Sequence, residues 1–398
     1  MTQAPSLPVR PVAANHDANA EPGPLEQTVA ARDFSMLIAL MAIVVYFAVA
    51  TDGAFIGARN LSMLAIELSI TAVLALGMLL VILPGHIDLS VGSGIGLLGG
   101  VASVLIFEHA WPAPAAMGVA LVAGVCIWAL MGTLIVKQRV PSFIITLGGL
   151  LIFRGLHWMV IHNSTIPVTT GSENLLSRLT TFYISPRVGI ALAACVMALM
   201  GIAALRAHRA RSSQRVAADG ELAFMRWFVW SQLILLFVLS CNQHRGVPLS
   251  AAILGMVAFA VHVLTRLTPF GRYLYAIGGN EEAAFISGVP VQRVVIGAFV
   301  IMGAIVALTG LLQTAYAGAS TTTVGTLSEL DAVAACVIGG TTLRGGRGTV
   351  GGVLLGSLIM ATLLNGMTLM AVSPEMKYLA RGTVLALAVW VDVRLARR

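Results

Sequence analysis

Five charged side chains lie within or beside long apolar runs of the sequence. They are Glu67, Asp88, Arg154, Asp331 and Arg381. An ionisable group at membrane depth is costly, so such residues face the interior of a helical bundle or a water-filled path, and many of them pair with one another. The sequence leaves two interpretations open: these groups line a solute or proton pathway, or they form structural ion pairs.

The sequence has no motif for covalent chemistry. The Gly94-x-Gly96-x-x-Gly99 pattern lies inside an apolar run, which argues against a dinucleotide site between a strand and a helix. No Gly-Lys pair is followed by Ser or Thr, so the lysine-bearing phosphate cradle of ATPases is missing. The four cysteines form no Cys-x-x-Cys pair. We therefore expect no catalytic residue, no metal site and no cofactor.

The composition is typical of a protein in lipid. Hydrophobic types make up 58% of the 398 residues, only 10% are charged, and the mean hydropathy is +0.91. Soluble globular chains are about 45–50% apolar and about 25% charged. These values argue against a soluble enzyme, a disordered protein and a disulfide-rich module. The solid apolar runs argue against a membrane β-barrel, whose strands alternate polar and apolar residues. The net charge of +7 is spread over the edges of apolar runs, so it predicts no nucleic-acid surface.

The apolar runs predict an all-α, polytopic transmembrane helical bundle. A helix needs about 20 apolar residues to cross the hydrocarbon. Such runs lie at 34–51, 62–83, 90–107, 113–136, 143–162, 187–205, 226–240, 249–265, 294–314 and 377–393. Two more, 331–341 and 349–366, flank a glycine-rich stretch, and the first is short enough for a half-helix. We expect about 10–12 spans, some of them interrupted or re-entrant.

Polar stretches divide the chain into a membrane domain and two tails. Residues 1–33 are expected to form a disordered cytoplasmic tail, 34–393 the transmembrane domain and 394–398 a cytoplasmic C-terminal tail. A basic loop at 206–225 and a polar loop at 266–293 are also expected in the cytoplasm. Basic residues favour that side. In this topology most of the 24 basic residues lie inside, and the outer segments hold only Arg59, Arg178, Arg187, Arg245 and Lys377.

Two rows of glycines at four-residue spacing each open an apolar run. The rows consist of Gly92, Gly96 and Gly100, and of Gly348, Gly352 and Gly356. Such rows let helix backbones approach closely in a membrane. Each row follows polar or glycine residues at membrane depth, 84–90 and 339–347, and paired interruptions of this kind are typical of transporters. Plain helix packing explains the rows equally well, whereas the interruptions favour transport.

The polar loop at 266–293 carries the signals of one short helix. Asn280 can accept a hydrogen bond at its start, and Glu281 and Glu282 follow in the first turn, where the helix dipole favours carboxylates. Gly288 fits the left-handed position past the end, and Pro290 prevents continuation. The sequence therefore predicts a helix over 281–287.

A helix of this length is not stable alone in water, so it needs a surface on which to dock. Phe285 and Ile286 offer an apolar face for a groove in a partner. A solvated surface turn is the other interpretation of this segment.

Four motifs occur together over most of the chain. They read Ile-Asp-Leu-Ser-Val-Gly-Ser at 87–93, Val-Pro-Ser-Phe-Ile at 140–144, Tyr-Ala-Ile-Gly-Gly-Asn-Glu-Glu-Ala-Ala at 275–284 and Leu-Asp-Ala-Val-Ala-Ala-Cys-Val-Ile-Gly-Gly at 330–340. Together they resemble permeases of bacterial monosaccharide ABC importers of the ribose, xylose and arabinose type. Segments 51–55 and 58–60 resemble those of xylose-transporting members, so D-xylose is the expected cargo.

This resemblance implies a membrane-spanning permease without its own ATPase site, in the bacterial inner membrane with both termini in the cytoplasm. The implied partners are a cytoplasmic ATP-binding subunit, a periplasmic sugar-binding protein, a second permease copy and membrane lipid. The residues expected to couple to the ATPase are Asn280, Glu281, Glu282, Ala283, Ala284, Phe285, Ser287 and Gly288.

We expect a translocation pathway lined or shaped by Asp88, Ser90, Gly92, Phe143, Thr146 and Asn365. The alternative function is a proton-coupled secondary transporter of a small polar solute, with Glu67 or Asp88 as the proton relay. A membrane-bound transferase would need a catalytic cluster at one membrane face, and the sequence offers none.

Overall fold

The computed structural model describes residues 24–169, 171–213 and 220–396, which form mainly helices. The long helices are α1 (Pro24–Ala50), α2 (Ala58–Ile82), α3 (Val91–Phe107), α4 (Ala113–Gln138), α5 (Ser142–Val160), α7 (Pro186–Ser213), α8 (Gly220–Asn242), α9 (Leu249–Leu267), α12 (Val291–Ala317), α14 (Val350–Leu369) and α15 (Pro374–Ala396). The short helices are η1 (Ala54–Ile56), α6 (Leu175–Thr181), α10 (Pro269–Gly279), α11 (Glu281–Ile286) and α13 (Ser328–Ile338). Each apolar run expected from the sequence coincides with a helix.

Within the described residues, seven helices are long and apolar enough to cross a membrane. They are α2, α4, α5, α9, α12, α14 and the Pro186–Arg206 part of α7. Shorter apolar helices occur at Met36–Ala50, in α3 and at Trp227–Asn242. Helix α13 has 11 residues and is about 16 Å long, roughly half the hydrocarbon thickness, so it is the half-helix expected there. The all-α membrane fold class is confirmed.

Several helices extend beyond the boundaries expected from the apolar runs. Helix α1 begins at Pro24, ahead of the apolar residues, because proline suits the first helical position and good helix formers follow it. Helices α7 and α8 take up most of the basic stretch that was expected as the loop 206–225, and α15 extends to Ala396. Residues 1–23, 214–219 and 397–398 lie outside the described part of the chain.

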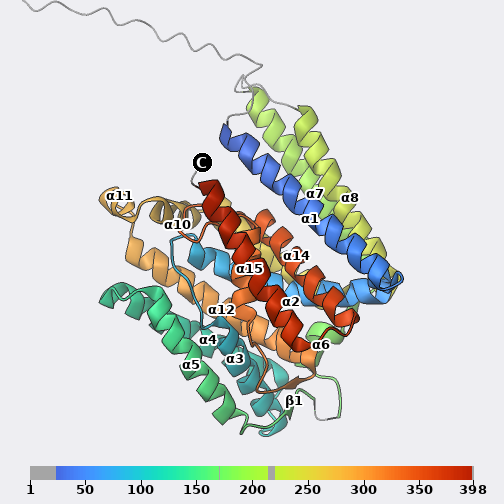
Figure 1. The fold of residues 1–398 in the computed structure, drawn as a ribbon, viewed down its shortest axis with the longest axis vertical. Helices are drawn as coiled ribbons and strands as arrows, with labels where there is room; N and C mark the ends of the chain where they lie inside the picture. The colour runs from blue at the N-terminus through green and yellow to red at the C-terminus, as the bar shows by residue number, and fades with distance from the viewer. Residues whose placement is uncertain (1–23, 170, 214–219, 397–398) are drawn as a thin grey trace, which may run out of the picture.

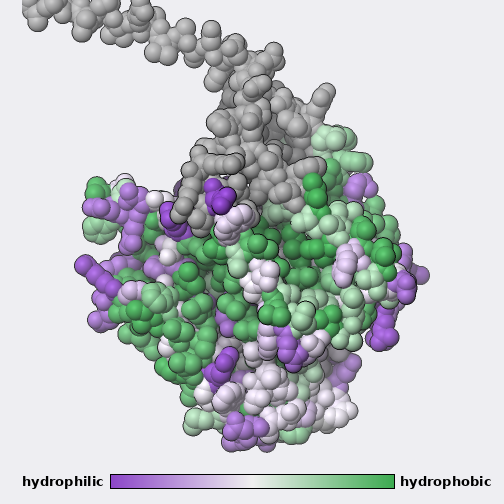
Figure 2. Space-filling model, viewed as in Figure 1, coloured by the Kyte–Doolittle hydropathy of each residue, from purple (hydrophilic) through white to green (hydrophobic). Residues whose placement is uncertain are grey.

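Helix α2 forms the centre of the bundle. Its second half, from Ala72 onward, is buried almost completely, and it packs against α9, α12, α13 and α14. Helices α4, α5 and α9 lie further out and expose large apolar side chains. Figure 2 shows hydrophobic residues across the middle of the molecule and hydrophilic ones gathered toward its edges. This pattern is that of a bundle whose outer surface faces lipid.

The two ends of the bundle carry different elements (Figure 1). Helices α10 and α11 lie at the same end as the C-terminal end of α15. The opposite end carries α6 and two small antiparallel sheets. In these sheets β1 (Ile166–Pro167) pairs with β4 (Ala319–Ser320), and β2 (Tyr183–Ile184) pairs with β3 (Val247–Pro248). The sheets tie together loops that are far apart in the sequence.

The glycine rows serve close helix packing. A Cβ built at Gly352 would overlap the carbonyl oxygen of Gly339, and one at Gly356 would overlap that of Ala335 on α13. In the first row, Gly96 and Gly100 lie against the imidazole of His157 on α5. The packing interpretation of both rows is therefore confirmed.

Helices α3 and α12 also meet through glycine. A Cβ at Gly310 would lie 2.7 Å from the carbonyl oxygen of Ile95, and one at Gly99 would lie 2.8 Å from that of Gly310. Real side chains do not tolerate such distances, so this crossing needs glycine on both helices.

We predict that Gly310→Ala destabilises the purified protein by about 1–3 kcal/mol, because α3 and α12 must separate to admit the methyl group. Gly255→Ala on α9 is the matched control, since a Cβ there meets no atom within 4 Å. Thermal unfolding in detergent measures both variants. Equal midpoints for the two would contradict the tight crossing.

Candidate functional site

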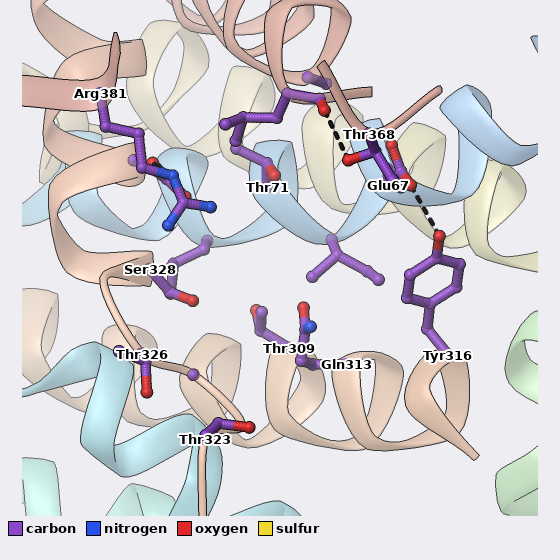
Figure 3. A pocket seen from close by; sticks show the side chains of 16 residues that line it. Glu67, Thr71, Thr309, Gln313, Tyr316, Thr323, Thr326, Ser328, Thr368 and Arg381 are labelled. Atoms are coloured by element: carbon purple, nitrogen blue, oxygen red, sulfur yellow. Dashed lines mark hydrogen bonds and ion pairs between the residues drawn. The ribbon is translucent and has the colours of Figure 1, made fainter. Parts of the chain in front are cut away.

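A polar cavity of about 240 Å³ lies between α2, α12, α14, α15, the start of α13 and the segment that precedes it. Figure 3 shows the hydroxyls, carboxylates, amide and guanidinium that surround it. The polar residues of its lining are Glu67, Thr71, Thr309, Gln313, Tyr316, Thr323, Thr326, Ser328, Asp331, Thr368 and Arg381. The apolar side chains Ile70, Leu74, Ala361 and Leu364 complete the wall.

Glu67 is fixed at one side of the cavity by two donors. The hydroxyl of Tyr316 donates to its Oε1 at 2.7 Å, and the Nδ2 amide of Asn365 donates to its Oε2 at 3.0 Å. The amide of Asn60 in turn donates to the Oδ1 of Asn365 at 2.8 Å. These bonds hold the Glu67 carboxylate in one orientation, and they join α2, α12 and α14.

Asp331 and Arg381 form an ion pair across the cavity wall. The Nε of Arg381 on α15 lies 3.2 Å from the Oδ1 of Asp331 on α13. Both side chains are mostly shielded from solvent, so each charge depends on the other for compensation. Of the five charged residues singled out in the sequence, these two therefore form a structural pair at the cavity.

Asp88 lies in the interrupted segment between α2 and α3 and is completely buried. The indole Nε1 of Trp128 donates to its Oδ2, and the amide and hydroxyl of Ser90 both donate to its Oδ1. Ser90 is buried as well. Both residues were expected to line or shape a pathway. Here they hold the segment 84–90 against α4.

The start of α5 holds the same segment from the other side. The amide of Ile87 donates to the hydroxyl of Ser142 at 3.3 Å, and the hydroxyl of Thr146 donates to the Ile87 carbonyl at 3.3 Å. Two of the sequence motifs, 87–93 and 140–144, thus meet in space. Phe143 projects outward from α5 and is exposed in the single chain.

Gly92 and Asn365 complete the set of expected pathway residues. A Cβ at Gly92 would overlap the carboxylate of Glu329, so Gly92 allows a close contact with the start of α13. Asn365 reaches the cavity through its bond to Glu67. None of the six expected pathway residues is itself in the cavity lining.

Most of the cavity residues were not predicted from the sequence, because they come from five separate segments of the chain. Their charged members, Glu67, Asp331 and Arg381, carried a signal in the sequence, since they are ionisable groups inside apolar runs. The hydroxyl residues and Gln313 carried none, because single polar residues of these types are common in membrane helices.

Both interruptions begin where a helix ends, and the two helix ends have the same hydrogen-bonding pattern. After α2, the amide of His86 donates to the Val81 carbonyl and the amide of Gly85 to that of Ile82. After α13, the amide of Thr341 donates to the Cys336 carbonyl and that of Gly340 to Val337. Gly85 and Gly340 have φ of +89° and +78°, as this left-handed end requires. The two segments are therefore structural counterparts.

The short helix predicted in the polar loop is confirmed as α11, which is one residue shorter than expected. The Asn280 side chain accepts a hydrogen bond from the Ala283 amide at 2.9 Å. At the other end, the amide of Val289 donates to the Ala284 carbonyl and that of Gly288 to Phe285, with Gly288 at φ +81°. Both caps formed as the sequence indicated.

Helix α11 presents its apolar side chains to the outside. Phe285 is 71% exposed and Ile286 is 77% exposed, whereas Ala284 faces the protein. Glu281, Glu282 and Ala283 are exposed, as is Ser287. Figure 1 shows the helix standing out from the end of the bundle.

Helix α10, which leads into α11, ends against both interruptions. A Cβ at Gly278 would overlap the Leu83 carbonyl and the Gly346 amide nitrogen, so no side chain fits there. That Gly346 amide donates to the Leu83 carbonyl at 2.9 Å. We call this contact of Gly278, Leu83 and Gly346 the glycine junction.

Tyr275 gives α10 a second attachment to the same region. Its hydroxyl donates to the Gly348 carbonyl at 2.8 Å. Burial raises the pKa of the Tyr275 phenol, an effect that the nearby Arg266 opposes, so the hydroxyl remains protonated and able to donate at neutral pH.

The described residues contain no group of three or more His, Cys, Asp or Glu side chains that could hold a metal ion. The cavity's groups are instead hydrogen-bond donors and acceptors, and its one guanidinium is paired. Such a lining can accommodate a small, neutral, polar solute.

Comparison with known proteins identifies the family of this chain and several relatives. The family described as "Branched-chain amino acid transport system / permease component" matches residues 60–389. The xylose transport system permease protein XylH of Escherichia coli (strain K12) is 39% identical over 367 residues, 92% of each chain. XylH of Haemophilus influenzae is 38% identical over 90% of this chain and 95% of its own.

The ribose import permease protein RbsC of Escherichia coli (strain K12) is 32% identical over 89% of this chain and 92% of its own. No solved structure matches the chain. The relatives agree in length with this chain as well as in sequence, and the family covers the cavity, the interruptions and α11. This chain belongs to the branched-chain amino acid transport system permease component family.

Proposed function

We propose that this chain is the membrane-spanning permease subunit of an ATP-binding-cassette importer that carries D-xylose across the bacterial inner membrane. The single observation that carries the proposal is the 39% identity to a xylose permease over 92% of both chains. The polar cavity supports it, because its hydroxyl-rich lining and paired guanidinium suit a neutral sugar.

Helix α11 is the docking element for a cytoplasmic ATPase in this proposal. It is a capped, six-residue helix whose Phe285 and Ile286 have no partner within the described chain and suit an apolar groove. The sequence has no phosphate-binding lysine motif of its own, so a separate subunit supplies ATP hydrolysis.

The orientation follows from charge and from the position of α11. The end of α7, the start of α8, the polar loop with α11 and the C-terminal end of α15 share one end of the bundle (Figure 1). The sequence near these ends is rich in basic residues, so the positive-inside rule assigns this end to the cytoplasm. The loops at 52–60, 163–186 and 315–329 then face the periplasm and receive the sugar-binding protein. A second permease copy completes the assembly.

Coupling runs through the glycine junction. When the ATPase closes, it displaces α11 and with it α10. Gly278 touches the Leu83 carbonyl after α2 and the Gly346 amide before α14, so one movement displaces both interrupted segments together. The pathway then changes its access from one side of the membrane to the other, driven by the differential affinity of the ATPase for the two states.

The proposal is tested by reconstitution in liposomes with the ATPase and the binding protein from adjacent genes. We expect xylose uptake only when ATP, both partners and this chain are present. Uptake of xylose against a gradient by this chain alone, without nucleotide and sensitive to an uncoupler, would establish a proton-coupled transporter instead.

We predict that Glu282→Lys on α11 weakens association with the ATPase about five- to tenfold, since it reverses an exposed charge beside the apolar contact. Co-purification of the tagged ATPase measures the effect. Glu375→Lys is the matched control, because Glu375 is exposed at the start of α15, away from α11. Undiminished recovery with Glu282→Lys would refute the docking role.

We predict that Gly278→Ala lowers the number of xylose molecules imported per ATP about tenfold, while the ATPase still binds. The added methyl group separates α10 from the Leu83 carbonyl and the Gly346 amide. The neighbouring Gly279→Ala is the control, because a Cβ there meets no atom within 4 Å. A normal ratio of transport to hydrolysis in Gly278→Ala would remove the junction from the mechanism.

A further inference from the structure

The cavity contains polar side chains that have no partner in the protein. Gln313 on α12 and Thr71 on α2 both line it, and neither side chain forms a hydrogen bond to the described residues. A polar group inside a membrane bundle needs a hydrogen-bond partner, because leaving it unpaired costs free energy. These groups therefore direct their hydrogen-bonding capacity into the cavity (Figure 3).

Glu67 adds acceptors on the same side. Its carboxylate receives one bond from Tyr316 and one from Asn365, whereas an ionised carboxylate has about four acceptor positions. None of the described residues forms an ion pair with it. A fixed carboxylate that faces an unpaired amide and hydroxyls provides acceptors and donors for the neighbouring hydroxyl groups of a sugar.

The charges of the lining disfavour an anionic or zwitterionic cargo. Arg381 is the one cationic residue of the lining, and Asp331 already compensates it. A carboxylate or phosphate on the cargo would find no unpaired cation among the lining residues, and Glu67 would repel it. A polyhydroxylated neutral molecule meets no such penalty.

The cavity lies where an imported solute would first enter the bundle. Its lining includes Thr323 and Thr326, which belong to the segment between β4 and α13, and Ser328 at the start of α13. That segment is at the end of the bundle opposite α11, the end that the proposed function assigns to the periplasm.

We propose that this cavity is a monosaccharide-binding site within a single permease chain, at which one neutral sugar pauses after the binding protein releases it. Gln313 and Glu67 bind the sugar hydroxyls, and Thr71 contributes one further bond. The proposal rests on the proposed function for the identity of the sugar, and it places the site inside one chain rather than between two copies.

Saturation-transfer NMR on the purified chain in nanodiscs detects a weakly bound sugar directly. We expect a signal from D-xylose with the wild type and with Gln292→Leu, an exposed position at the far end of the same helix. Gln313→Leu should weaken xylose binding about tenfold, the effect of losing ~1.4 kcal/mol. Thr71→Val keeps the shape of the side chain and should weaken it by a smaller factor, so the site is testable even if Gln313→Leu folds poorly.

Competition separates the possible cargoes. Excess ribose should reduce the xylose signal, whereas leucine and xylose 5-phosphate should leave it unchanged. A missing xylose signal with the wild type, an unaltered signal in both Gln313→Leu and Thr71→Val, or displacement by leucine would each overturn the assignment.

Uptake by the reconstituted complex distinguishes this proposal from the proposed function. If the wild-type complex fails to import xylose, the proposed function fails. If it imports xylose and Gln313→Leu does so at the wild-type rate with the same ratio to ATP hydrolysis, the proposed function stands and the binding site is refuted.

Discussion

The structure depends on satisfying backbone hydrogen bonds where helices break inside an apolar bundle. A membrane offers no water to the free carbonyl and amide groups at a helix end, so the protein must pair them itself. Helices α2 and α13 solve the problem in the same way, with a glycine in the left-handed conformation and two amides turned back onto the last carbonyls. The remaining Leu83 carbonyl is paired by the amide of Gly346 from the other interruption. The break after α2 is therefore completed by the segment that follows α13.

This hydrogen bond joins the two interruptions, so we expect them to move together. Asp88 ties the first to α4 through Trp128, and Ser142 and Thr146 tie it to α5. The second continues directly into α14. Helix α10 reaches both interruptions at Gly278, the position where a side chain would force the breaks apart. In the proposed coupling, a displacement at α11 acts on the ends of several membrane helices at one point, without a long chain of intermediate contacts.

The parts of this arrangement that depend on neighbouring residues were predictable from the sequence. Asn280 and Gly288 specify both ends of α11 within nine residues, and the apolar runs specify the membrane helices. The extension of α1 to Pro24 was missed because the run of apolar residues, and not helix propensity, set the expected boundary. The cavity could not be predicted, since Glu67, Gln313 and Arg381 meet only after the bundle has packed. Asp88 shows the same limit: its charge was visible, but Trp128, its partner, lies 40 positions away.

The charged side chains of the cavity are paired or hydrogen-bonded within the protein, which suits a transporter better than a storage site. A site that both accepts and releases its cargo must bind it weakly, because tight binding at an intermediate position would slow the whole cycle. Pairing Arg381 with Asp331, and fixing Glu67 by Tyr316 and Asn365, leaves neutral or partly satisfied hydrogen-bonding groups to meet the cargo. Hydrogen bonds of that kind exchange with water at little net cost in free energy. In the proposed function, selectivity for a neutral sugar comes from the penalty on charged competitors, and the energy that drives import enters at α11, at the opposite end of the bundle.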